Sequence, residues 1–588
     1  MGLATIFFAC LLPSLDVTVH AEGPDGFGDV LILDENGAGI TGQPFSLRQV
    51  RLLELEVAGF HALTQWLSES ARPVRDLGAN ATRVSLPSAR GSLYRYERKD
   101  PLVRGSRFGF FLVGANGRPR ILAERPGVGL EAGVDPFTPW VAARADGKGL
   151  LIATTPDAGG DLFELDVVQG TSVNRTTSLA PLTLRPEGLL LVDTFGVGVT
   201  TSGIVRFSTS TGATAQFVDL GASAPTYYPG PLVASADGST VAALAGFSPT
   251  ACDVHVFGAT GPAIRVTPAP VPLSQSGTPQ SVANGPHLAL SPDGSTCAWT
   301  TVGLARELYV RSVGLTAFAP DHVSSDARFL DTLDEISSIR FVTPDTVTFL
   351  LGSVELPEGT VEDGDFFSAT LDPLQGTVSL TNLSLTSGDA TAPFLSPGQV
   401  KSEGGVFTVD GLDGYLLHDD QSSNTGDIRL VQAGVTGYPV VVPDVAELEA
   451  FAVSAGQACF VARRDLPGDP RELWSLPLSA PSSPQLLTAL PSATQLNSLV
   501  PDGANRFVYQ RTAQGGHRLG RINASLGTVQ ELPIPTLPFV PTVGWSPSGG
   551  VVSTLFVGGM GWIAHWPTAG SPQLVGSIPA LVRVLPGR

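Results

Sequence analysis

The sequence predicts an all-β protein built from repeated antiparallel meanders, and two observations support this prediction. In the stretch Asn284–Ser312, short apolar runs are separated by the turn Ser291–Gly294. Proline presets the backbone for a turn and glycine accepts positive φ, so Pro-Asp-Gly between β-forming runs predicts a hairpin. The composition agrees, because 67 Gly, 48 Pro and only 15% charged residues are typical of a turn-rich β-protein.

The second observation is repetition, because similar turns recur about every 40 to 60 residues. Good copies occur at Ala145–Gly147, Pro186–Gly188, Ala236–Gly238, Pro501–Gly503 and Pro547–Gly549, and weaker ones at Arg90–Gly91, Pro344–Asp345, Glu403–Gly404 and Ala455–Gly456. A three-stranded meander cannot bury both of its apolar faces alone, so copies should pack on either side. This spacing fits the blades of a β-propeller with variable outer loops better than a helical repeat. Tandem β-sandwiches are the alternative.

The best copies resemble the WD40-like group of propeller repeats known as PD40 or TolB-like. Its repeat reads roughly Ser-Pro-Asp-Gly, an apolar strand, a gap, and Leu-Tyr before an apolar residue. Ser291–Gly294 with Leu308-Tyr309 matches it best, followed by Ser546–Gly549. The resemblance implies a fold, because members of this group scaffold, bind or cap enzymes and the repeat itself carries no chemistry.

The chain divides into three predicted parts. Residues 3–12 are apolar and Val19-His20-Ala21 provides small residues at the positions that a signal peptidase reads, so residues 1–21 are predicted to be a signal peptide cleaved after Ala21. Residues 22–80 form a short N-terminal module or linker. Residues 81–588 form the propeller, with about seven or eight blades and up to ten repeat motifs. The protein is then expected to be secreted or periplasmic.

The N-terminal module contains the best candidate for a helix, Ser46–Ala71, whose apolar residues recur at helical spacing. Leu53–Val57 also alternates like a strand. Gly37, Gly39 and Gly42 match a dinucleotide-binding motif, but no second parallel strand follows, so a β-turn is favoured. Outside residues 1–21 no apolar run of about 18 residues could span a bilayer.

Motifs for catalysis are missing from the sequence. The 8 histidines are scattered, and no metalloprotease motif or serine-hydrolase elbow occurs. Cys252 and His255 have a C-x-x-H spacing, but strand alternation places them on opposite faces. Cys252, Cys297 and Cys459 are predicted to pack as free thiols, with a Cys252–Cys297 disulfide as the alternative. We therefore predict no catalytic residues, no cofactor and no enzymatic activity.

Acidic stretches with glycine leave metal binding unknown. Asp410–Gly414, Glu362–Asp365 and His418–Asp420 could supply oxygen ligands to Ca²⁺, although none matches a known calcium loop. The net charge of -19 argues against a nucleic-acid partner, because such binding depends on clustered basic residues.

The function predicted from these observations is binding. Surface recognition uses exposed aromatic and arginine side chains, and the sequence offers a small set of them: Tyr227-Tyr228, Arg463-Arg464, Trp545, Trp562 and Trp566. We predict a secreted, non-enzymatic propeller that binds a protein, peptide or glycan on one face, or that acts as an envelope scaffold as TolB does. The alternative is a metal-dependent hydrolase or lactonase that uses His and carboxylates in the propeller channel.

Overall fold

The computed structural model describes most of the predicted strands and their turns. The described residues are 17–33, 47–58, 72–75, 82–86, 91–100, 105–114, 117–129, 133–144, 146–210, 212–221, 225, 228, 232–235, 237–248, 251–267, 288–300, 308–313, 321–322, 334–354, 361–372, 377–382, 389–391, 406–409, 412–420, 426–432, 440–454, 456–464, 466–468, 470–480, 483–490, 495–501, 505–513, 516–531, 543–545, 551–557, 560–566, 573–578 and 581–585.

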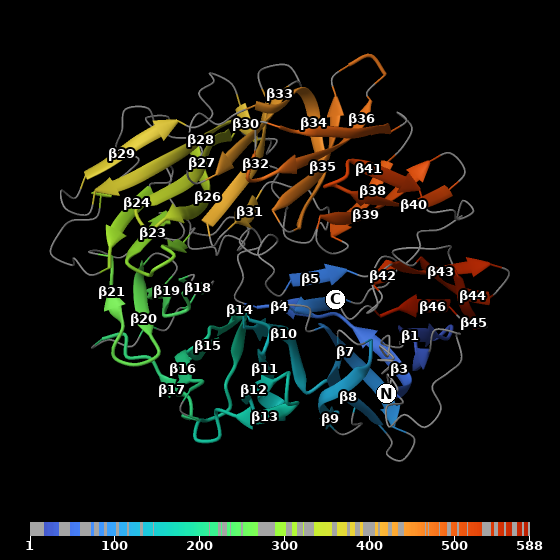
Figure 1. Ribbon diagram of the computed structural model, residues 1–588. Helices are drawn as coiled ribbons and strands as arrows, with labels where there is room; N and C mark the ends of the chain where they lie inside the picture. Colours follow the sequence, from blue (N-terminus) through green and yellow to red (C-terminus); the bar gives the residue numbers. More distant parts are fainter. Residues whose placement is uncertain are drawn as a thin grey trace, which may run out of the picture. The chain divides into compact units, whose positions relative to one another are not determined.

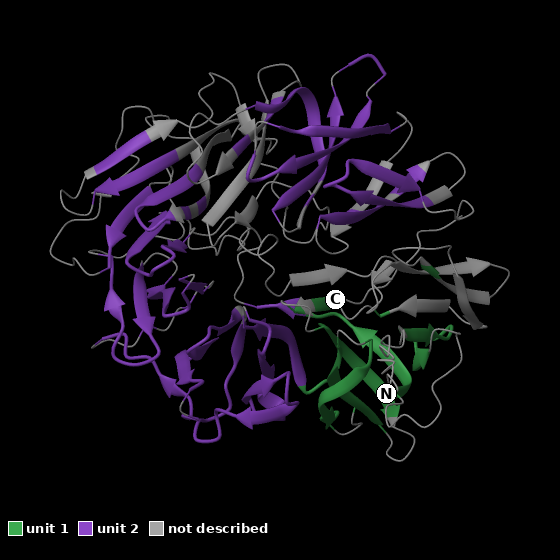
Figure 2. Cartoon of the chain, viewed as in Figure 1, with its two compact units in different colours: residues 1–55, 73–136, 533–588 green, residues 56–72, 137–532 purple. Residues whose placement is uncertain are grey.

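The protein is all-β and is built from repeated antiparallel sheets, as the sequence predicts for the blades of a β-propeller (Figure 1). Within the residues given above, the only helical element is the short 3₁₀ turn Pro156–Ala158. A helix long and apolar enough to cross a membrane does not occur in this described part. The chain forms two compact units, which are residues 1–55, 73–136 and 533–588, and residues 56–72 and 137–532 (Figure 2).

Unit 1 contains a nine-stranded sheet with the order β46-β1-β2-β3-β7-β6-β5, in which β8 pairs with β7 and with β9. Its strands are β1 (Val17–Glu22), β2 (Gly28–Leu33), β3 (Leu47–Leu53), β5 (Arg72–Arg75), β6 (Thr82–Leu86), β7 (Gly91–Asp100), β8 (Gly105–Val113), β9 (Pro119–Pro126) and β46 (Leu581–Val584). A four-stranded sheet follows the order β42 (Val543–Trp545), β43 (Val551–Val557), β44 (Met560–Trp566) and β45 (Gln573–Ile578). The predicted N-terminal module thus contributes strands to the larger sheet.

The helix predicted over Ser46–Ala71 is wrong for the part that the structure describes, where residues 47–53 form β3. Leu47 and Val50 are both buried. They face Val30 and Gly28 of β2 across a register shift, at which Gln49 has a φ of 55°. A β-bulge adds one residue to a strand, so two buried residues lie three apart as they would in a helix. Residues 59–71 lie outside the described residues.

Unit 2 begins with β4 (Glu56–Val57), which pairs in parallel with the first strand of a meander. The first meander is β10 (Phe137–Ala143), β11 (Gly149–Thr154), β12 (Leu162–Asp166) and β13 (Thr171–Asn174), and the second is β14 (Leu184–Leu191), β15 (Phe195–Thr200), β16 (Gly203–Ser208) and β17 (Gln216–Phe217). The third is β18 (Val233–Ala234), β19 (Thr240–Ser248), β20 (Ala251–Gly258) and β21 (Ile264–Arg265), and the fourth is β22 (Leu288–Leu290), β23 (Thr296–Thr300), β24 (Leu308–Ser312) and β25 (Asp321–His322). The fifth is β26 (Asp334–Thr343), β27 (Thr346–Val354), β28 (Val361–Asp372) and β29 (Thr377–Asn382).

The last part of unit 2 contains an eight-stranded sheet and a further meander. The sheet has the order β30-β32-β33-β34-β35-β36-β37, and β31 pairs with β32. These strands are β30 (Asp389–Thr391), β31 (Val406–Val409), β32 (Leu412–Asp420), β33 (Gly426–Gln432), β34 (Val440–Ser454), β35 (Gln457–Arg464), β36 (Arg471–Pro477) and β37 (Gln485–Leu490). The meander is β38 (Gln495–Pro501), β39 (Arg506–Ala513), β40 (Gly516–Asn523) and β41 (Thr528–Glu531).

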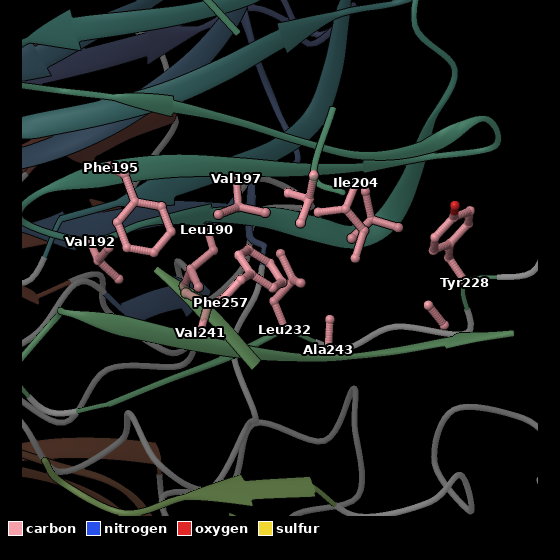
Figure 3. Close-up of a cluster of buried hydrophobic side chains, with 13 residues drawn as sticks. Leu190, Val192, Phe195, Val197, Ile204, Tyr228, Leu232, Val241, Ala243 and Phe257 are labelled. Carbon is pink, nitrogen blue, oxygen red and sulfur yellow. The ribbon is translucent and has the colours of Figure 1, made fainter. Parts of the chain in front are cut away.

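The core of unit 2 lies between consecutive sheets. Phe195 and Val197 of β15 pack with Val241 and Ala243 of β19 in one buried cluster, to which Tyr228 contributes from the intervening loop (Figure 3). Similar clusters join the β18–β21 sheet to the β22–β25 sheet, and that sheet to the next. Inner strands such as β11, β15 and β23 are buried throughout, because their side chains alternate between two such clusters.

The predicted turn at Pro292-Asp293-Gly294 is confirmed between the antiparallel strands β22 and β23. The Gly294 N–H donates to the Ser291 carbonyl (2.9 Å), and Gly294 has a φ of 71°. The Ser291 hydroxyl and the Ser295 N–H both donate to Asp293 Oδ1, at 2.7 and 3.0 Å. The Asp237 turn repeats this arrangement, and its Asp237 N–H donates to the Pro292 carbonyl (3.1 Å). The turn of one sheet is therefore hydrogen-bonded directly to the turn of the neighbouring sheet.

The other predicted turns have mixed outcomes. Gly147 and Gly456 have positive φ in turns between paired strands, and Pro344-Asp345 joins β26 to β27. Pro186–Gly188 is wrong as a turn, because it lies inside β14 at a register shift, and the chain reverses after Val192 instead. Motif residues at 145, 236, 403–404, 455, 502–503 and 547–549 lie outside the described residues.

Alternate reversals of the chain give the meanders of unit 2 two ends. We call the end where first strands turn into second strands, and third into fourth, the turn side. The end where second strands turn into third strands is the hairpin side. Gly527 in a third-to-fourth turn lies against the side chain of Gln485, which follows the equivalent turn of the preceding sheet. The turn sides of these two neighbouring sheets therefore lie next to each other.

Candidate functional site

The candidate site lies on the hairpin side of unit 2, where β34 passes from one meander to the next. The first part of β34 pairs with β33 and the second with β35, with register shifts between Val445 and Glu447 and between Leu448 and Ala450. At this bend Asp444 has a φ of 51°. A residue other than glycine with positive φ carries local strain, and such residues concentrate at functional sites.

Seven residues at this bend and the facing strand ends form what we call the corner cluster. They are Asp444, Glu447, Glu449, Arg463, Arg464, Arg471 and Glu472. Arg463 and Arg464 are consecutive on β35, so their side chains leave opposite faces of the sheet. The cluster therefore consists of one ion-pair group on each face.

The first group joins three strands through four side chains. Arg463 Nη2 donates to Glu447 Oε2 (3.1 Å), and Arg463 Nε lies 3.9 Å from Glu449 Oε1. Arg471 Nε lies 2.7 and 2.8 Å from the two carboxylate oxygens of Glu449. The Glu447 side chain is 49% exposed and that of Arg463 is 30% exposed, whereas that of Glu449 is only 13% exposed. The pair closest to solvent is thus Arg463–Glu447.

The second group is more buried and holds the bend in place. Arg464 Nη1 donates to Glu472 Oε2 (2.9 Å), and Arg464 Nε donates to the carbonyl of Asp444 (3.1 Å). Trp474 Nε1 donates to the same Glu472 oxygen (3.2 Å). The hydrogen bond from Arg464 to the Asp444 carbonyl holds the backbone of the bend in place, three residues before Glu447.

Glu449 differs electrostatically from the other carboxyl groups in the described part of the chain. Burial raises its pKa, and nearby Glu447 adds to this effect, although Arg471 and Arg463 oppose it. Where a carboxyl pKa is otherwise shifted in these residues, it is lowered, as for Asp25, Glu124, Asp146, Asp237 and Asp293. A carboxyl whose pKa is raised beside specific charged partners is a candidate functional group, although structural ion-pair networks shift pKa values as well.

The structure separates the recognition residues that the sequence predicts. Arg463 and Arg464 lie in the corner cluster. Tyr228 is buried, and its hydroxyl donates to the Pro225 carbonyl (2.7 Å), so it belongs to the core. Tyr227 lies outside the described residues, and so do the side chains of Trp545, Trp562 and Trp566, which belong to β42 and β44.

The acidic candidates for metal binding mostly lie outside the described residues. This holds for Asp410 and Gly411, for residues 421–425 beside His418–Asp420, and for the side chains of Glu362–Asp365 in β28 and of β32. Among side chains that the structure does describe, no group of three or more His, Cys, Asp or Glu could hold a metal ion.

The cysteines and His255 follow the strand alternation that the sequence predicts. Cys252 and Cys297 are buried in the same apolar cluster as free thiols, as is Cys459 in another, and burial raises the pKa of Cys252 to about 12. The Cys252–Cys297 disulfide is therefore not formed. His255 points to the other face of β20 and is buried, which lowers its pKa.

Sequence reasoning missed most of the corner cluster. Glu447 and Glu449 lie two residues apart on one strand, close to the Arg463-Arg464 pair on the next, which is a weak signal of cross-strand ion pairing. The bend at Asp444 leaves no such signal, because proline at 443 fits an ordinary edge strand as well.

The sequence matches no protein-family model and no curated protein. Solved structures resemble the fold. A eukaryotic initiation factor matches 73% of this chain and 96% of its own at 11% identity, with a TM-score of 0.36. The Dos1 propeller matches 73% and 92% at 11% identity, with a TM-score of 0.32. A prolyl endopeptidase matches 63% of this chain at 12% identity, with a TM-score of 0.29, and this chain spans only 52% of that enzyme.

The prediction that the chain is not an enzyme is contradicted by these comparisons. Prolyl endopeptidases, prolyl oligopeptidase B from Galerina marginata and the AtxE2 isopeptidase are among the similar structures. The absence of sequence motifs was therefore an insufficient reason to exclude an enzyme, and that prediction is withdrawn. The likeness itself, at TM-scores of 0.19 to 0.29 for these proteins, is a likeness of fold.

Proposed function

We propose that unit 2 binds a polypeptide partner on its hairpin side, with the corner cluster at the centre of the contact. The observation that carries this proposal is the accessible Arg463–Glu447 pair on a strained bend. Leu466, three residues along the chain from Arg463 in the hairpin between β35 and β36, is 42% exposed. Arginine is enriched among the residues that contribute most to binding at the centres of protein interfaces.

The arrangement favours a polypeptide over the other partners considered. Arg463 can exchange its bond to Glu447 for a partner's carboxylate, while Glu447 can then accept from a partner's amide or basic side chain. A net charge of -19 disfavours nucleic acid. A glycan would stack on aromatic rings, and the only aromatic side chain bonded to the described cluster is Trp474, whose ring nitrogen is engaged by Glu472.

Two finer features belong to the same proposal. We place the chain in the PD40 or TolB-like group of propeller repeats, on the basis of Ser291–Gly294 and Leu308-Tyr309. We also propose that it acts outside the cytoplasm, in a secreted or periplasmic location, on the basis of the apolar residues 3–12.

Site-specific crosslinking tests this proposal. A photoreactive phenylalanine analogue replaces Leu466 in one protein and Leu526 in another, and both are exposed to an extract of the organism that makes the chain. Leu526 is 71% exposed and lies in a turn-side loop, so it controls for adventitious apolar contact. We expect one discrete crosslinked protein from position 466 and none from position 526. Equal labelling from both positions would contradict the proposal.

A further inference from the structure

Strand β1 contains the peptide bond at which the sequence predicts signal-peptide cleavage. This strand lies inside the nine-stranded sheet of unit 1, between β2 and β46. All six of its residues pair with β2, from Val17 opposite Leu33 to Glu22 opposite Gly28. Its other edge pairs with β46, from Val19 opposite Val584 to Glu22 opposite Leu581. Removal of residues 17–21 would therefore expose the backbone edges of two strands.

Both faces of β1 are packed. Thr18, Val19 and His20 are each at most 1% exposed. Val19 points to the face opposite that of Thr18 and His20, because side chains alternate along a strand. The Thr18 hydroxyl donates to the Gly117 carbonyl (2.5 Å), and His20 Nε2 lies 2.9 Å from the carbonyl oxygen of Val50. A segment buried on both faces and both edges is an interior part of the fold.

The bond predicted to be cleaved is itself in close contact with the neighbouring strand. A Cβ atom added at Gly28 would lie 1.9 Å from the Ala21 carbonyl oxygen and 2.7 Å from Glu22 Cα. Glycine at 28 therefore permits the approach of β2 to the Ala21–Glu22 peptide. The closer part of this contact, to the Ala21 carbonyl, would be lost in a chain that begins at Glu22.

We infer that the mature protein keeps Val17–Glu22, and that any leader removed from the chain ends before Val17. Val19-His20-Ala21 satisfies the small-residue pattern of a processing site because a buried strand in a crowded sheet also selects small and β-branched residues. This inference is independent of the partner proposed above.

Truncation provides the first test. Three proteins are compared by solubility and thermal unfolding: the full chain, a chain starting at Val17, and a chain starting at Glu22, each of the last two with an added initiator methionine. The chain that starts at Val17 should have the same melting temperature as the full chain. The Glu22 chain should be insoluble or melt at least about 5 °C lower. Equal melting of the two truncated chains would overturn the inference.

A point variant provides a test that does not depend on a truncated chain folding. Gly28→Val in the full chain should lower the melting temperature, because the added side chain meets the Ala21 carbonyl. Gly129→Val is the control for steric contact, since the nearest atom to its added Cβ is a valine methyl at 3.9 Å. Its φ of 97° is positive, unlike that of Gly28, so the control carries backbone strain that Gly28→Val does not. The N-terminus of protein purified from its natural source completes the test. A start at or before Val17 supports the inference, and a start at Glu22 overturns it.

Discussion

Asp293 in the turn side of unit 2 and Glu449 in the corner cluster are both carboxyl groups in bends of the chain, but their surroundings act in opposite directions. Asp293 accepts from a hydroxyl and a backbone N–H of its own turn, and these bonds lower its pKa against the opposing effect of burial. Glu449 is held by arginines from other strands, and burial still raises its pKa. Local bonds thus stabilise the charged form of one carboxylate, whereas the other is only partly compensated.

The comparison separates a structural motif from a candidate site. The turn satisfies its own polar groups and joins neighbouring sheets, so it has little capacity left for a ligand. The corner cluster combines strain, a raised pKa and an accessible ion pair. Protein regions that break local rules without local compensation are where function is expected.

The largest expected effect comes from filling the turn. Gly294→Val places a branched side chain at a φ of 71°, where its Cβ would lie 2.7 Å from Thr240 Oγ1 of the neighbouring sheet. We expect a loss of about 1 to 3 kcal/mol in the free energy of unfolding, measured by urea denaturation. Gly456→Val is the control, because its φ is 75° but no atom lies within 4 Å of the added Cβ. Its loss should be smaller. Equal losses would show that contact between sheets at the turn is unimportant.

A smaller effect is expected at the corner cluster. Arg471→Leu leaves Glu449 mostly buried without its closest partner, and we expect a loss of about 1 to 2 kcal/mol. The double variant with Glu449→Leu should recover most of this loss, since replacing both partners removes the uncompensated charge. If the double variant is as unstable as the single one, the cost arises from lost packing at Arg471 instead.

The smallest effects concern pH, and they should have opposite signs. A raised folded-state pKa at Glu449 means that its contribution to stability falls as pH rises through the window just above the usual glutamate value. As the pH rises through that window, Glu449→Gln should therefore become more stable relative to the wild type. A lowered pKa at Asp293 contributes stability above the usual aspartate value and loses it as pH falls through the folded pKa. Asp293→Asn should thus cost more at about pH 6 than at about pH 3. Parallel pH profiles for the two variants would contradict the assignment.

Features held together by residues close in the sequence could be predicted, whereas those that join distant residues could not. The turn at Ser291–Ser295 is bonded within five residues, so its proline, aspartate and glycine are visible as a motif. Arg463 and Glu447 are 16 positions apart, and Arg471 and Glu449 are 22 apart, so their pairing depends on strand register. Pro186–Gly188 has the turn residues but no serine or aspartate anchor, and it became part of a strand. The bulge at Gln49 imitated helical spacing because one extra residue shifts the strand period.

The central claim is that the corner cluster binds a partner, and Arg463→Ala tests it most directly. Its side chain is 30% exposed and pairs with the half-exposed Glu447, so its removal should change the free energy of unfolding by less than about 1 kcal/mol. The same variant, carrying the photoreactive analogue at position 466, should lose its crosslinked partner. Unchanged crosslinking together with a clear loss of stability would contradict the claim and assign the cluster to the fold alone.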